Sequence, residues 1–99
     1  MRAIHLARLD KTRPALVLTR DRVRQHRQWV TVAPVTTTVR GLTTELPVGT
    51  ANGLDHDSVV SLDNILTIPA SDLGRQVGQL LPEQEPALTE AIQAAFDLD

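Results

Sequence analysis

Three consecutive threonines and two arginines are the residues of this 99-residue chain best suited to chemistry. In the stretch VAPVTTTVRGL, Thr36, Thr37 and Thr38 follow an apolar segment and precede Arg40. Arg13 stands directly before another apolar run, PALVLT. A guanidinium matches the oxygens of a phosphate, and hydroxyls and backbone amides can complete an anion site. If the two apolar segments form neighbouring strands, Arg13 and Thr36 share one phosphate pocket; otherwise both are ordinary strand ends.

Histidine offers a weaker alternative for chemistry, and cysteine offers none. The three histidines, His5, His26 and His56, lie far apart in the sequence. No sequence pattern supports a histidine pair that cleaves RNA, and a histidine metal site has still less support. The chain contains no cysteine, which excludes disulfides and cysteine-based zinc sites. We therefore expect neither a metal nor a cofactor.

Basic and acidic residues are divided between two halves of the chain. Residues 1–44 contain nine Arg or Lys and two Asp, whereas residues 45–99 contain one Arg and ten Asp or Glu. A basic half can form an anion-binding face, unless the halves interleave in the fold and their charges mix. The stretch TRDRVRQHR is either a solvated hairpin loop or a flexible loop that contacts phosphates. Trp29 and Phe96 are the only rings, so a broad base-stacking platform is not expected.

Short apolar segments with β-branched residues and frequent turn signals predict a mainly β protein. We expect strands over Ala3–Leu9, Pro14–Thr19, Trp29–Val35 and Gly41–Gly49, a charged connection over Asp21–Gln28 and a turn over Thr50–Asp57. Ser58–Pro69 predicts one long strand or two short ones. Gly74 and Gly78 argue against a long helix beginning at Ser71 or Asp72. A turn and then a strand over Arg75–Leu80 are expected there.

The end of the chain predicts a helix over Pro82–Phe96, with Leu88, Ile92 and Phe96 forming an apolar stripe that packs on the sheet. Together these elements predict one domain over residues 1–99, of mainly β (α+β) class, built as a small half-open barrel with a C-terminal helix. No segment resembles a signal peptide or approaches the roughly 20 apolar residues that span a membrane. We expect a cytoplasmic protein that does not bind membranes.

Three stretches, TRPALVLT, VAPVTTTVRGLTTELPV and GLDHDSVVSLDNILTIPASDLGRQVGQL, resemble the three sequence blocks of the MazF/PemK/Kid family of toxins, most closely the mycobacterial MazF toxins. The resemblance extends from about Leu9 to Leu81. It implies an SH3-like barrel with a C-terminal helix and a homodimer. It also implies the toxin of a type II toxin-antitoxin system, inhibited by a MazE-like antitoxin that lays an acidic flexible segment along the RNA groove.

The resemblance further implies a metal-independent endoribonuclease that cuts single-stranded RNA at short sequences and so inhibits translation and growth. In such a reaction the 2′-hydroxyl attacks the adjacent phosphate and leaves a 2′,3′-cyclic phosphate and a 5′-hydroxyl. The family's arginine before proline corresponds to Arg13, and its catalytic threonine corresponds to Thr36. Arg13 would stabilise the charge on the pentavalent phosphorane, while Thr36 would lie against the scissile phosphate.

The RNA path implied by the resemblance is lined by Thr37, Thr38, Arg40, Asp63 and Asn64. Asp63-Asn64 stands where family members more often have Glu-Gln or Asp-Gln. A longer loop with Gly, Ser and Glu precedes the arginine in many members, and in this chain it is reduced to Asp-Lys-Thr. We expect the remaining loop residues Lys11 and Thr12 to contact RNA.

Two other functions remain open from the sequence. A gyrase-poisoning toxin resembling CcdB would share the fold, but those relatives act through an aromatic-glycine-aliphatic end, which the final residues AAFDLD do not resemble. A non-catalytic SH3-like binding module would usually expose an aromatic groove. Two aromatic residues in the whole chain argue against such a module.

Overall fold

The computed structural model describes residues 2–20 and 28–98. The predicted connection over Asp21–Gln28, with His26 and most of the basic stretch, therefore lies almost entirely outside the described residues. The strands are β1 (Ala3–Arg8), β2 (Thr12–Val17), β3 (Trp29–Thr36), β4 (Glu45–Val48), β5 (Ser58–Ser61), β6 (Leu66–Pro69) and β7 (Leu73–Gln79). Short 3₁₀ turns are η1 (Thr50–Asn52), η2 (Leu62–Asn64), η3 (Ala70–Asp72) and η4 (Pro82–Gln84), and the helix is α2 (Glu85–Ala95).

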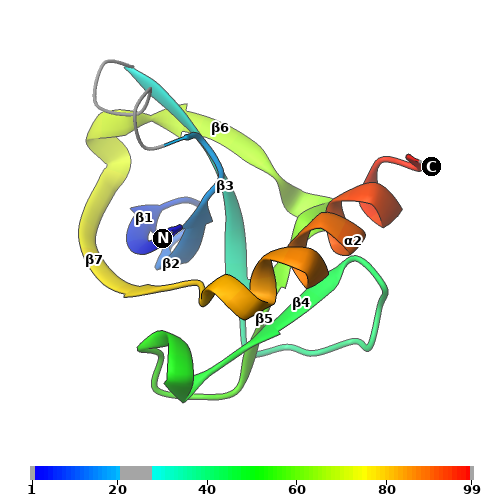
Figure 1. Cartoon of the computed structure of the whole chain (residues 1–99). Coiled ribbons are helices and arrows are strands. Elements are labelled where there is room, and N and C mark those ends of the chain that lie inside the picture. The colour runs from blue at the N-terminus through cyan, green and yellow to red at the C-terminus, as the bar shows by residue number, and fades with distance from the viewer. Residues whose placement is uncertain (1, 21–27, 99) are drawn as a thin grey trace.

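The strands form one antiparallel sheet in the order β4-β5-β3-β2-β1-β7, with β6 also paired to β3. The sheet curls strongly, and α2 packs across it against β4 and η2 (Figure 1). β4 and β7 lie at the two ends of the strand order, so the barrel stays open. The predicted class, a mainly β half-open barrel with a C-terminal helix, is confirmed. No described helix is long and apolar enough to cross a membrane.

β3 is the central strand of the sheet, because it pairs with β2, β5 and β6. One of its edges pairs with β2, while the other pairs first with β6, through Val32, and then with β5, from Val35 onward. Pro34 lies at the step between these two ladders, where a missing backbone N–H removes no ladder hydrogen bond. Ser58–Pro69 accordingly forms the two short strands that the sequence allowed, because η2 separates β5 from β6.

Alternate residues of β2 and β3 face two separate core clusters. Leu16, Ala33 and Val35 belong to the larger cluster, which α2 covers through Leu88 and Ala91. The smaller cluster lies on the opposite face of these two strands and contains Ala7, Ala15, Val17, Val30, Val32 and Ile68. Both faces of β2 and β3 are therefore buried, which fixes their register because a slip by one residue would exchange the two sets.

Several predicted boundaries are wrong in ways that bear on the site. β2 begins at Thr12, so Arg13 lies inside the strand and not before it. The predicted strand over Gly41–Gly49 contracts to Glu45–Val48, because the preceding residues turn around the Glu45 carboxylate. In the helix, Leu88 is buried as predicted, but Phe96 follows the last helical residue and is 56% exposed. Ala91 takes the buried place instead.

A close backbone contact explains one glycine of β7. A Cβ at Gly78 would overlap the backbone carbonyl oxygen of Asn52 in η1. Gly53, which follows η1 and has a φ of +89°, would likewise bring a Cβ within 2.6 Å of the Val77 carbonyl oxygen. Gly78, one of the two glycines that argued against a helix, therefore allows β7 to lie against the η1 turn.

We expect Gly78→Ala to lower the free energy of unfolding by roughly 1–3 kcal/mol, the usual cost of overpacking a closed contact. Gly74→Ala is the matched control, because its Cβ would approach the Leu6 carbonyl oxygen only to 3.3 Å. Urea denaturation of both variants measures the difference. Equal losses in the two variants would show that the Gly78 contact does not constrain this part of the fold.

Candidate functional site

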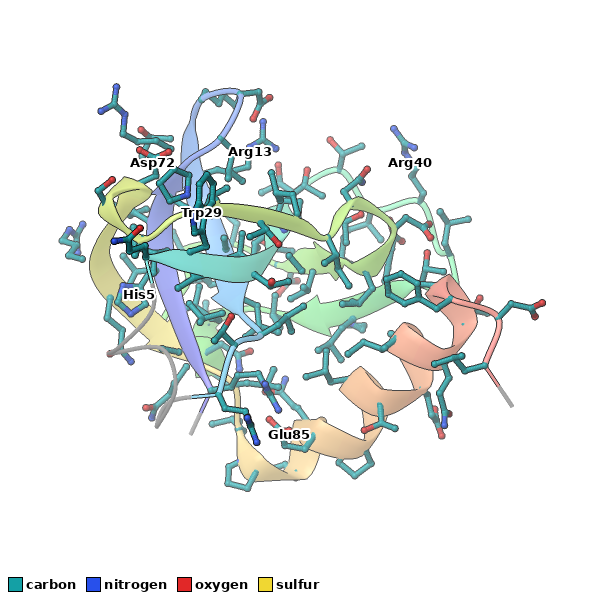
Figure 2. The ribbon with its side chains drawn as sticks, turned by 90° about the horizontal axis from the view of Figure 1, so that it is seen from above. His5, Arg13, Trp29, Arg40, Asp72 and Glu85 are labelled. Carbon is teal, nitrogen blue, oxygen red and sulfur yellow. The ribbon has the colours of Figure 1, made fainter. Side chains whose placement is uncertain are left out.

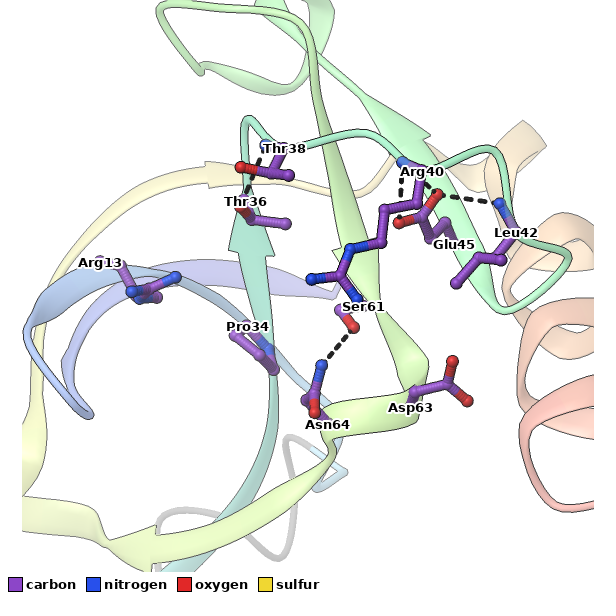
Figure 3. A pocket seen from close by; sticks show the side chains of 10 residues that line it. All are labelled: Arg13, Pro34, Thr36, Thr38, Arg40, Leu42, Glu45, Ser61, Asp63 and Asn64. Carbon is purple, nitrogen blue, oxygen red and sulfur yellow. Dashed lines mark hydrogen bonds between the residues drawn. The ribbon is translucent and has the colours of Figure 1, made fainter.

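A pocket of about 350 Å³ lies where β2, β3, β5 and the loop before β4 meet (Figure 3). It is lined by Arg13, Pro34, Thr36, Thr38, Arg40, Leu42, Glu45, Ser61, Asp63 and Asn64. Six of the predicted site residues are thus brought together. Thr37 instead lines a second pocket on the other side of the strand end. Lys11 and Thr12 are exposed and line neither pocket.

The pairing of β2 with β3 explains why Arg13 and Thr36 share this pocket. Ala15 pairs with Pro34, and Val17 pairs with Val32. Continuing the same register by two residues sets Arg13 opposite Thr36. Side chains that oppose each other across an antiparallel pair point to the same face. The pocket is therefore an extension of the face that carries the smaller core cluster, beyond the point where its apolar residues end.

Arg13 is anchored at one end of its guanidinium. Its Nη2 donates to Asp10 Oδ2 at 2.8 Å, and its side chain is only 22% exposed. Its Nε is the one buried side-chain nitrogen or oxygen in the described part of the chain that has no hydrogen-bond partner. An unpaired buried donor of this kind costs roughly 1–3 kcal/mol. An anion oxygen in the pocket would remove that cost, which makes Arg13 the strongest anion-binding feature of the site.

Thr36 ends β3 with its hydroxyl already oriented. Its Oγ1 accepts a hydrogen bond from the Thr38 amide at 3.1 Å. The hydroxyl is then free to donate its own hydrogen to an oxygen bound in the pocket. Thr36 and Thr38 therefore differ in their roles: Thr36 lines the pocket at the end of β3, and the Thr38 amide fixes the orientation of its hydroxyl.

Glu45 holds the loop over residues 37–44 in place. Its carboxylate accepts the amide hydrogens of Arg40, at 3.1 and 3.3 Å, and of Leu42, at 3.1 Å (Figure 3). Hydrogen bonds to a charged acceptor are roughly twice as strong as those between neutral groups. Glu45 therefore positions Arg40 and Leu42 beside the pocket, while its own charge is used within the protein. The sequence analysis did not identify Glu45 as a site residue. A usable signal was present, because this acid follows Arg40 by five residues and comes directly after a Gly-Leu-Thr-Thr turn.

The remaining wall comes from β5 and η2. Asn64 Nδ2 donates to Ser61 Oγ at 2.8 Å, which leaves the amide oxygen of Asn64 without a partner among the described residues. Asp63 accepts the Thr44 hydroxyl at 2.6 Å and so ties η2 to the loop before β4. The predicted Asp63-Asn64 pair thus lines the pocket and also fastens two of its walls together.

The charges of the site come from both halves of the sequence. Arg13 and Arg40 belong to the basic half, whereas Glu45 and Asp63 belong to the acidic half. The basic and acidic halves of the sequence therefore interleave at the pocket. This is the alternative that we gave to a purely basic face. Arg40 forms no ion pair with any described residue, so the pocket keeps one unpaired cation beside the partly paired Arg13. Arg13 and Arg40 lie along one edge of the molecule, far from Glu85 (Figure 2).

The histidine hypotheses find little support at this pocket. His5 lies on β1 and its Nδ1 is 2.9 Å from the carbonyl oxygen of Gly74, away from the pocket. His56 lines the second pocket. Within residues 2–20 and 28–98, no three His, Asp or Glu side chains are grouped so that they could hold a metal ion.

Comparison with known proteins now decides the family. The model of the family described as "PemK-like, MazF-like toxin of type II toxin-antitoxin system" matches residues 5–96. The chain belongs to this family. It is 67% identical to "Endoribonuclease MazF3" of Mycobacterium tuberculosis, over all of this chain and 96% of that protein. The predicted resemblance is confirmed.

Solved structures agree with this MazF-family assignment. "Mycobacterium tuberculosis toxin MazF-mt6" superposes with a TM-score of 0.97 at 66% identity, covering 99% of each chain. A second structure, described as an endoribonuclease in complex with its cognate antitoxin from a mycobacterial species, has a TM-score of 0.86. Its identity is 24%, over 98% of this chain and 93% of that one, so it supports the fold alone.

We expect Glu45→Ala to speed hydrogen exchange at the Arg40 and Leu42 amides, because both lose their acceptor. Glu45→Gln, which keeps one side-chain oxygen, should slow the exchange again at one of them. NMR-detected exchange on the intact protein measures both. Glu90→Ala, which removes an exposed carboxylate of α2, is the control. Unchanged exchange at both amides in Glu45→Ala would show that other contacts hold the loop.

Proposed function

We propose that this MazF-family endoribonuclease cuts single-stranded RNA at short sequences, without a metal ion, and so inhibits translation and growth as the toxin of a toxin-antitoxin pair. The observation that carries the proposal is the pairing of Arg13 and Thr36 in one pocket, with the buried Arg13 Nε unpartnered. A phosphate is bound well by charged and neutral hydrogen-bond donors together. The pocket supplies both from strands, a guanidinium on β2 and a hydroxyl on β3.

In the proposed reaction, the 2′-hydroxyl of one nucleotide gives its proton to water as its oxygen attacks the adjacent phosphorus. The bond from phosphorus to the 5′-oxygen of the next nucleotide breaks, and that oxygen takes up a proton from water. The products carry a 2′,3′-cyclic phosphate and a 5′-hydroxyl. Negative charge grows on the non-bridging oxygens as the phosphorane forms. Arg13 stabilises that charge with fixed donors, and the Thr36 hydroxyl donates to the same oxygens. A guanidinium stays protonated in proteins, so Arg13 acts through its charge and its hydrogen bonds.

The rest of the RNA path follows the same surface. Arg40 and Thr38 contact the backbone on one side of the scissile phosphate, and Asp63 and Asn64 contact the nucleotides on the other. The open amide oxygen of Asn64 supports a role in reading a base. Lys11, Thr12 and Thr37, outside this pocket, provide contacts at its margins, and Lys11 lies in the turn just before β2.

The nuclease hypothesis is favoured over the two alternatives. The 67% identity to a protein named an endoribonuclease covers the whole chain. No described feature favours gyrase inhibition or a binding module without catalysis.

Arg13→Ala and Thr36→Ala should each lower kcat by about 10²–10³, the usual effect of removing one donor to a developing oxyanion. Cleavage of a long unstructured RNA in EDTA, with the 5′ ends of the products mapped, measures the loss. Arg8→Ala is the charge-matched control, because Arg8 is exposed and lines neither pocket. Full activity of both folded variants would contradict the proposed roles of Arg13 and Thr36, and products without 5′-hydroxyl ends would contradict the chemistry.

We propose two protein partners for the chain, both in the cytoplasm. A MazE-like antitoxin with an acidic flexible segment is supported by the family description and by the charge of Arg13 and Arg40 along the pocket. A second copy of the chain is supported by four exposed apolar side chains, in the loop before β4 and beyond α2: Val39, Leu42, Phe96 and Leu98. Exposed apolar surface of this kind is typical of protein interfaces.

Phe96→Ser should convert a dimer into a monomer at micromolar concentration, because it removes a large apolar group from the proposed interface. Sedimentation velocity measures the change. Trp29→Ser is the matched control: Trp29 has the same exposed fraction, 56%, and lies on the far side of the molecule from the end of α2 (Figure 2). If the Trp29 variant dissociated and the Phe96 variant did not, the result would contradict an interface at Phe96 and would place it near Trp29.

A further inference from the structure

A second pocket, of about 380 Å³, lies on the other side of the β3 end from the first. It is on the opposite face of β2 and β3, because its lining residues Pro14 and Val35 alternate with Arg13 and Thr36 along the strands. Its volume falls within the roughly 300–1,000 Å³ of small-ligand sites. The proposed chemistry uses only the first pocket.

The two pockets meet at one residue. Thr36 lines both of them, as the last residue of β3. Thr37 lines the second pocket and Thr38 the first. A polymer held by its phosphate at Thr36 therefore has the second pocket as its immediate neighbour around the strand end.

The second pocket combines apolar walls with unpaired polar groups at its rim. Leu6 and Val77 contribute apolar wall surface from β1 and β7. Asp55, His56 and Arg75 also line the pocket. None of these three side chains forms a hydrogen bond or an ion pair with another described residue. All three residues are solvent-exposed, so a carboxylate, an imidazole and a guanidinium are accessible to a ligand at the rim.

The loop that carries Asp55 and His56 is held firmly by its neighbours. Asn52, which is buried, donates to the Gln79 carbonyl oxygen at 3.0 Å and to Gln84 Oε1 at 2.6 Å. Ser58 Oγ donates to the backbone carbonyl oxygen of His56 at 2.9 Å. The loop is thus fixed at both ends, and Gly53 lies directly against β7. Such a preformed wall reduces the ordering cost of binding.

We propose that the second pocket holds the base of a nucleotide next to the scissile phosphate and sets the cleavage preference at that position. This inference rests on the proposed ribonuclease function. Leu6 and Val77 contact the faces of the base, in place of the aromatic rings that the chain largely lacks. Arg75 donates to acceptors on the base edge, while Asp55 accepts from exocyclic amino or ring N–H groups. His56 provides a further donor or acceptor.

The test compares cleavage of a randomised RNA pool by the wild-type protein and by Arg75→Ala, His56→Ala and Asp55→Asn, with cut sites sequenced. Each variant should still leave 5′-hydroxyl ends. The preference at one position beside the cut should relax by about tenfold, the scale of a single base contact. On the preferred substrate KM should rise by a similar factor, with kcat changed less. Arg8→Ala removes the same charge from an exposed position that lines neither pocket, and should leave both quantities unchanged.

The outcomes separate this inference from the function on which it rests. Cleavage with an unchanged preference and an unchanged KM in all three folded variants would overturn the second subsite and leave the nuclease assignment standing. Loss of kcat alone would also overturn it, because that would place these residues in the chemical step. No cleavage by the wild-type protein would overturn both. Thermal melts of the variants confirm that each is folded.

Discussion

The antiparallel pairing of β2 with β3 is the constraint on which the rest of the structure depends. Both strands are buried on both faces, so their register cannot slip without exchanging two core clusters. That register sets Arg13 opposite Thr36 at the point where the apolar residues end. On its other edge, β3 changes partner from β6 to β5 at Pro34. The same step brings η2, with Asp63 and Asn64, to the pocket.

Around this rigid pair, single polar side chains hold the loops. Glu45 binds the amides of Arg40 and Leu42, and Asn52 connects η1 to β7 and to the start of α2. The hydrogen bonds to Glu45 are strengthened by its charge, and those of Asn52 by their partial burial. The site is therefore organised before any ligand arrives, and Arg13 keeps a buried donor free for the ligand.

The strand end at Thr36 separates two pockets of different character. One carries the cations and hydroxyls suited to a phosphate, and the other combines apolar walls with rim groups suited to a base edge. With two aromatic rings in the chain, recognition of RNA must depend on shape, charge and hydrogen bonds. Two adjoining pockets that share the end of β3 would provide all three without stacking.

Local patterns in the sequence predicted the class of the fold and pointed to Arg13 and Thr36, which share the pocket. The β-branched segments, turn signals and C-terminal helix pattern are local properties, and they predicted the half-open barrel. Arg13 and Thr36 followed once their strands were taken as neighbours, and the family resemblance made that choice. Asp63 and Asn64 were predicted through the resemblance alone. Local pattern also misled: the spacing of Phe96 suited the apolar stripe, but the helix ends one residue earlier.

The remaining features of the site depend on contacts between segments that are distant in the sequence, so they are visible only in the folded chain. Glu45 is an ordinary acid in the sequence, and its role exists only because the preceding turn directs two amides at it. Thr37 and Thr38 are chemically identical, yet the end of β3 sends them to different pockets. Gly78 is required by the approach of Asn52 from another part of the chain. No spacing along the sequence encodes such contacts, whereas packing of the folded chain determines each of them.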